Sequence, residues 1–115
     1  MKTYKGGCHC GKVSYEADME LTKVLDCNCS HCSQKGFLLT FVPKTNFRLL
    51  SDEDTLTEYR FGRKSIQHLF CKICGVESFA YGEGKQGPTA MINVRCLQDV
   101  DLSKLEIEHF NGKDW

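Results

Sequence analysis

The sequence predicts a single all-β domain, spanning residues 1–115, that is stabilised by bound metal. Three observations support this prediction. Most of the chain consists of short segments in which apolar and polar side chains alternate between turn residues, as in antiparallel strands. No stretch has the apolar periodicity of a long amphipathic helix. Seven of the eight cysteines fall into three tight clusters, a spacing typical of ligands for one small cation.

Length and charge narrow the functional classes. A chain of 115 residues is long enough to bury roughly two thirds of its unfolded surface. Lys and Arg together number 15, as do Asp and Glu, so no excess positive charge favours nucleic acid as a partner. No apolar run resembles a signal peptide or approaches the roughly 20 residues that cross a bilayer. We therefore expect a cytoplasmic protein with no membrane partner.

The expected strands follow one another along the chain. Residues 3–17 predict a first hairpin, with its turn at His9–Lys12, and residues 23–27 predict a strand that leads into a cysteine-rich loop. The acidic tip Asp52–Asp54 is expected to be a solvated turn. Trp115 is expected to cover a pocket or close the core, because its large apolar area gains from burial. Further strands are expected over residues 37–42, 47–50, 55–61, 76–81, 90–96 and 105–110, with a loop over 82–87.

The cysteine clusters predict two zinc sites. Thiolate sulfurs bind zinc in a tetrahedron at about 2.3 Å; a closed structural site takes four protein ligands and a catalytic site takes three. The outer pairs together supply four thiols, and the central cluster supplies three. We call these sets the four-cysteine site (Cys8, Cys10, Cys71 and Cys74) and the three-cysteine site (Cys27, Cys29 and Cys32). Only the second would leave a metal position open.

Other assignments of these residues stay open. Disulfides between clusters are the alternative to metal, although a reducing cytoplasm favours metal. His9 lies between two converging thiols, so its side chain is expected to point away from them. His31 would complete a tetrahedron at the three-cysteine site, but four ligands from a six-residue loop would strain it. Cys96 stands alone and is expected to be a small buried apolar residue.

Three motifs, in this order, resemble the glutathione-dependent formaldehyde-activating enzyme family, also called the centromere-protein-V family. They are Gly7-Cys8-His9-Cys10-Gly11, Cys27-Asn28-Cys29-Ser30-His31-Cys32 and His68-Leu69-Phe70-Cys71-Lys72-Ile73-Cys74-Gly75. The resemblance runs nearly end to end and includes residues 93–97 and 110–115. It implies an Mss4-like all-β fold with zinc-stabilised stacked antiparallel sheets. It also implies a structural zinc on the four-cysteine site and an active-site zinc on the three-cysteine site.

The activity implied by the resemblance is formation of S-hydroxymethylglutathione from formaldehyde and glutathione, the reverse sense of a carbon–sulfur lyase. Three thiolates leave a zinc centre with a formal charge of minus one, which favours capture of a thiol over polarisation of an aldehyde. His31 is the one candidate base close in sequence, and Lys35 is either a carboxylate-attracting residue or a solvated lysine. The alternative function is a zinc-stabilised binding module, which a fourth ligand from His31 or Cys96 would favour.

Overall fold

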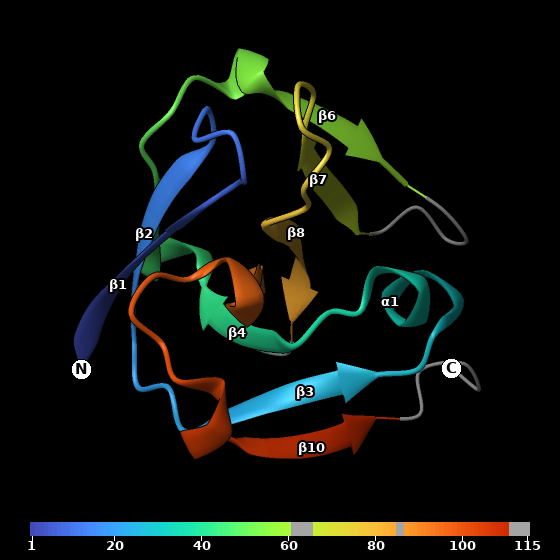
Figure 1. The fold of residues 1–115 in the computed structure, drawn as a ribbon. Helices are drawn as coiled ribbons and strands as arrows, with labels where there is room; N and C mark the ends of the chain where they lie inside the picture. The colour runs from blue at the N-terminus through green and yellow to red at the C-terminus, as the bar shows by residue number, and fades with distance from the viewer. Residues whose placement is uncertain (61–65, 85–86, 111–115) are drawn as a thin grey trace.

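The computed structural model describes residues 1–60, 66–84 and 87–110, and these form two β-sheets (Figure 1). The expectation for Trp115 lies outside the described residues. In the smaller sheet the strand order is β1-β2-β5, and in the larger it is β10-β3-β4-β9-β8-β7-β6. The predicted all-β class is confirmed. The strand bounds are β1 Lys2–Gly7, β2 Ser14–Met19, β3 Lys23–Cys27, β4 Leu39–Pro43, β5 Phe47–Leu49, β6 Leu56–Tyr59, β7 Gln67–Cys71, β8 Phe79–Gly84, β9 Gly87–Asn93 and β10 Glu106–Phe110.

One strand pair departs from the expected antiparallel arrangement. β10 pairs with β3 in parallel, with Glu106 opposite Lys23 and Phe110 opposite Cys27. After β9 the chain passes through 3-10 turns at Val94–Cys96 and Leu102–Lys104 before it enters β10. This long connection allows β10 to return in the same direction as β3 (Figure 1), which a tight hairpin would not.

The segment expected as a loop around the central cysteines contains a short helix, α1 (Ser30–Lys35). The Cys29 side chain caps its start by accepting a hydrogen bond from the Cys32 N–H. Gly36, at φ 68°, ends it in the left-handed conformation, and its N–H donates to the Cys32 carbonyl. A helix of six residues is too short to show a periodic apolar pattern, so the sequence did not indicate it.

Two further boundaries differ from the expectation. β8 begins at Phe79 and continues to Gly84, because Gly82 and Gly84 pair with β9 across a hairpin. The expected loop over 82–87 is therefore partly strand. β9 ends at Asn93, whose side chain accepts a hydrogen bond from the Arg95 N–H and starts a 3-10 turn.

The core lies between the two sheets. Tyr15 of β2 stacks on Phe47 of β5 at 5.0 Å between ring centroids and meets Phe79 of β8 edge-on at 5.5 Å. The Tyr15 hydroxyl donates to the Ser78 carbonyl at 3.4 Å. The smaller sheet is thereby tied to the segment that precedes β8, which carries part of the site described below.

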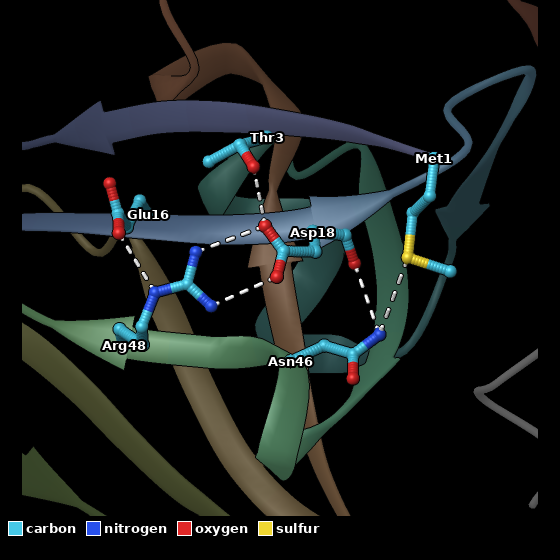
Figure 2. Close-up of polar contacts among 6 residues, drawn as sticks. All are labelled: Met1, Thr3, Glu16, Asp18, Asn46 and Arg48. Atoms are coloured by element: carbon cyan, nitrogen blue, oxygen red, sulfur yellow. Dashed lines mark hydrogen bonds and ion pairs between the residues drawn. The ribbon is translucent and has the colours of Figure 1, made fainter.

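An ion-pair network crosses the smaller sheet (Figure 2). Arg48 of β5 donates to both carboxylate oxygens of Asp18 at 2.9 and 3.0 Å and to Glu16 at 2.8 Å. Thr3 of β1 donates to Asp18 at 2.6 Å. The hydrogen bond from Arg48, then that from Thr3, lowers the pKa of Asp18 to about 2. The network therefore joins β1, β2 and β5. In the described part of the chain, no helix has the length and apolar character to span a bilayer.

Candidate metal centres

The turn after β1 and the turn after β7 bring the four-cysteine site together. The Cys10 sulfur lies 3.6 Å from the Cys8 sulfur and 3.6 Å from the Cys71 sulfur. All four sulfurs lie within 4.8 Å of one another, and all four cysteines are free thiols. A zinc tetrahedron with bonds of about 2.3 Å separates its sulfurs by about 3.8 Å, whereas a disulfide needs about 2.0 Å. The spacing fits a shared metal and does not fit a disulfide.

Backbone amides surround these sulfurs. The Val13 N–H donates to the Cys8 sulfur at 3.3 Å, and the amides of Ile73 and Cys74 donate to the Cys71 sulfur at 3.4 and 3.5 Å. The hydrogen bond from the Cys74 amide lowers the pKa of Cys71, and that from the Val76 amide lowers the pKa of Cys74 to about 6. Such donors favour thiolate, the form that binds metal. The turn after β7 therefore favours anionic sulfur at Cys71 and Cys74.

The three-cysteine site lies where β3 passes into α1. Cys27 ends β3, Cys29 caps α1 and Cys32 lies within the helix; their sulfurs are within 4.8 Å of one another. Cys27 and Cys32 are each 8% exposed and pack against Phe37, whereas Cys29 is half-buried. Solvent therefore approaches this site most readily at Cys29.

The three thiols differ electrostatically. Burial raises the pKa of Cys27 and of Cys32. Burial also opposes ionisation of Cys29, but hydrogen bonds outweigh it, beginning with the Cys32 N–H at 3.3 Å, and the pKa of Cys29 is lowered. Cys29 is thus the thiol of this set that ionises most readily without a cation.

His31 and Cys96, the two candidates for a fourth ligand, lie elsewhere. The His31 ring points to Glu77, with Nε2 3.4 Å from Oε1. The Cys96 sulfur is partly buried, not fully buried as expected, and lies 4.0 Å from the Glu77 carbonyl oxygen. Within residues 1–60, 66–84 and 87–110, the cluster of metal-binding side chains here consists of the three cysteines.

The remaining sequence candidates have surface positions. His9 is exposed and is not part of the four-sulfur cluster. Lys35 is also exposed, and its ammonium lies 5.8 Å from the centroid of the Phe70 ring. Neither residue is brought into a cysteine site.

Sequence reasoning missed a third cluster, formed by His31, His68 and Glu77. His68 was noted only as part of the third motif, and Glu77 was not noted. Their spacing was a usable signal, because His68 precedes Cys71 by three residues and Glu77 follows Cys74 by three. What the sequence did not indicate is that Glu77 is a buried carboxylate, 5% exposed.

Both cysteine sites fit zinc by donor type and by spacing. Four thiols at these separations match a closed tetrahedral centre, and three match a centre with one position left for another ligand. Without a cation, three anionic sulfurs this close would repel one another strongly, so full ionisation of the set requires a positive charge at its centre. The arrangement can hold a metal and present it to a small ligand.

Comparison with known proteins identifies a matching family and a similar solved structure. The model of a family described as "Glutathione-dependent formaldehyde-activating enzyme" matches residues 3–113, a span that includes every cysteine of both sites. The crystal structure of a Rhodobacter sphaeroides protein is similar at a TM-score of 0.77 and 25% sequence identity. The similarity covers 90% of this chain and 99% of that one, so the two folds correspond over nearly their whole lengths.

Proposed function

This chain belongs to the glutathione-dependent formaldehyde-activating enzyme family, and from that premise we propose that it binds two zinc ions and catalyses the reversible addition of glutathione to formaldehyde. The observation that carries the proposal is the set of three clustered sulfurs at Cys27, Cys29 and Cys32. Three protein ligands are the number that leaves a metal a position for substrate.

In the proposed reaction, the glutathione sulfur attacks the formaldehyde carbon. A carbon–sulfur bond forms, the carbonyl π bond breaks, and the oxygen takes up a proton to give S-hydroxymethylglutathione. The reverse direction is a carbon–sulfur lyase reaction. We place it in the cytoplasm, where a reducing environment keeps thiols free.

Zinc, when bound at the three-cysteine site, would lower the pKa of a substrate thiol and so supply the nucleophilic thiolate. The protein's part is to hold the three sulfurs in place. The β3 backbone fixes Cys27, and the turn of α1 fixes Cys29 and Cys32 through the Cys32 N–H bond to the Cys29 sulfur. Phe37 covers the two buried thiols and excludes water from that side.

The four-cysteine site has a different proposed role. Cys8 and Cys10 follow a strand of the smaller sheet, whereas Cys71 ends β7 of the larger sheet and Cys74 lies in the turn after it. A metal held by all four thiols would join the two sheets and leave no position for substrate. We therefore assign it a structural role.

The experiment uses NMR to measure the rate of exchange between formaldehyde and S-hydroxymethylglutathione. The two interconvert without a catalyst, so an enzyme is detected by an increase in this exchange rate. The zinc-loaded protein is compared with Cys29→Ser and with Cys96→Ser, a matched control outside both cysteine sites. We expect the wild-type protein and the control to accelerate exchange, and Cys29→Ser to leave it near the uncatalysed rate.

A binding measurement supports this assay. Glutathione should raise the melting temperature of the zinc-loaded protein, and S-methylglutathione, which has no free thiol, should not. No acceleration by the fully zinc-loaded protein would refute the enzyme proposal and favour a zinc-stabilised binding module.

A further inference from the structure

A cluster of three buried side chains joins α1 to the β7–β8 connection. His31 comes from α1, His68 from β7, and Glu77 from the segment between β7 and β8. The His31 Nε2 lies 3.4 Å from one carboxylate oxygen of Glu77, and the His68 Nδ1 lies 3.2 Å from the other. The two imidazole rings are 4.1 Å apart between centroids. Two ring nitrogens therefore converge on one carboxylate.

The cluster is screened from solvent. The side chains of His31, His68 and Glu77 are 10%, 8% and 3% exposed. The Tyr59 ring stacks on the His31 ring at 5.8 Å between centroids, and the Phe37 ring lies 5.6 Å from the His31 ring between centroids. A carboxylate this deeply buried is costly unless a positive charge compensates it. A divalent cation bound by both imidazoles and the carboxylate would supply that charge.

We propose that His31, His68 and Glu77 form a third metal site, one that binds a divalent cation of the zinc class through two nitrogens and one oxygen. One candidate ligand atom from each residue lies within 4.8 Å of the others. Zinc bonds to histidine and carboxylate are about 2.0–2.2 Å long, so neighbouring ligand atoms in a tetrahedron are about 3.3 Å apart. The nitrogen–oxygen separations of 3.4 and 3.2 Å are near that value, each measured to a different oxygen of the Glu77 carboxylate.

The donor set gives this site a chemistry unlike that of the cysteine sites. Two imidazoles and a carboxylate leave a bound dication with a formal charge of plus one, whereas three thiolates leave it with minus one. Such nitrogen and oxygen ligands suit zinc, cobalt, nickel and iron(II), and they do not select for soft, sulfur-seeking ions. Three protein ligands also leave room for a water molecule on the metal.

The position of the cluster gives the site a structural consequence. In the sequence, His31 lies between Cys29 and Cys32 of the three-cysteine site. His68 and Glu77 lie on either side of Cys71 and Cys74, which are half of the four-cysteine site. A cation here would link α1 to the β7–β8 connection. The proposal is independent of the catalytic one, since it concerns metal binding alone.

The test is a cobalt(II) titration of the full-length protein, followed by absorption spectroscopy and metal analysis after dialysis. Thiolate sites give intense sulfur-to-cobalt charge-transfer bands, and a site without sulfur gives only weak ligand-field bands. We expect the cysteine sites to fill with charge-transfer absorption and a further equivalent to bind with ligand-field absorption alone. His68→Gln and Glu77→Gln should each lose that further equivalent and keep the charge-transfer bands.

The matched control is His109→Gln, because the His109 side chain is 80% exposed and contacts Asp26 on the edge pair β3–β10. It should bind as much cobalt as the wild-type protein. Retained charge-transfer bands show that a variant is folded. If either His68→Gln or Glu77→Gln loses these bands, the conclusion is drawn from the other variant. Saturation of the wild-type protein with thiolate bands only, or a further equivalent that persists in both variants, would overturn the proposal and leave the cluster as an ion-paired network. The three-cysteine proposal would stand in either case, since its own bands report on it.

Discussion

The proposed roles of the two cysteine sites, one structural and one open to substrate, predict different effects on stability for two chemically identical substitutions. Cys71→Ser removes a thiol that lies 3.6 Å from Cys10 although the two residues are 61 positions apart in the chain. Cys29→Ser removes a thiol from a cluster contained in six consecutive residues. Each variant deletes one metal ligand, so a difference in stability reports what the metal joins.

The magnitude follows from the fold. A cross-link that closes a loop of about 60 residues lowers the conformational entropy of the unfolded chain. In the chain-entropy treatment this raises the free energy of unfolding by about 4 kcal/mol. Structural zinc contributes folding free energy of order 10 kcal/mol in small domains. The whole free energy of unfolding of a domain of this length is about 6–17 kcal/mol. Losing the four-cysteine metal should therefore remove most or all of the stability at 25 °C.

The expected effect of Cys29→Ser is much smaller. A metal at the three-cysteine site closes a short local loop and does not join the two sheets. Serine is also a good helix N-cap, so α1 keeps its first hydrogen bond. We expect a loss of about 1–3 kcal/mol, within the range of ordinary single substitutions.

The assay is thermal unfolding followed by circular dichroism, with zinc quantified in the same samples. Cys71→Ser should show no cooperative transition, and Cys29→Ser should unfold cooperatively with one equivalent of zinc fewer than the wild-type protein. Cys96→Ser is the matched control and should change neither quantity. Equal loss of structure in Cys71→Ser and Cys29→Ser would refute the division into a structural site and an open site.

Three further predictions follow from the same structure. Arg48→Gln should lower the free energy of unfolding at neutral pH, as measured by urea unfolding. The difference from the wild-type protein should shrink as the pH falls from about 4 towards 2, because Arg48 holds the pKa of Asp18 at about 2 in the folded state, below its ordinary 3.8. A difference that stays constant over that range would show that it does not come from the Arg48–Asp18 ion pair. Gly7→Ala should cost about 1–3 kcal/mol or more, since its Cβ would lie 2.3 Å from the Val13 carbonyl oxygen. Gly82→Ala should cost less, because its Cβ meets the flexible end of a methionine side chain at 2.8 Å, and equal costs in urea unfolding would count against the steric argument. Dialysis against a strong chelator should abolish the cooperative thermal transition, and added zinc should restore it; an unchanged transition in verified metal-free protein would show that no metal supports the fold.

Much of the fold could be predicted from the local pattern of residue types. Short strand-like segments, many with alternating apolar and polar side chains as in β10, located most strands to within a few residues. Cysteine spacing grouped the outer pairs, and the structure brings Cys8 and Cys10 to Cys71 and Cys74 as expected. These features succeed because strand period and ligand spacing are properties of neighbouring residues.

The features that the sequence did not predict depend on contacts between distant segments of the chain. The parallel pairing of β10 with β3 depends on the path of a long connection, and the six residues of α1 are held by caps at Cys29 and Gly36. Its neighbours in the chain make His31 a candidate zinc ligand, but in the fold its ring lies against Glu77 instead.

The β class, the family resemblance and the two groups of thiols can be read from the amino-acid sequence, because each depends on residue types at short spacing. Which histidines meet which carboxylate follows from the fold, since burial and contact depend on packing between elements that are far apart in the chain. Glu77 illustrates the difference. The sequence does not indicate whether this glutamate faces water or two imidazoles. In the structure, the packing of α1 against the β7–β8 connection places it between His31 and His68.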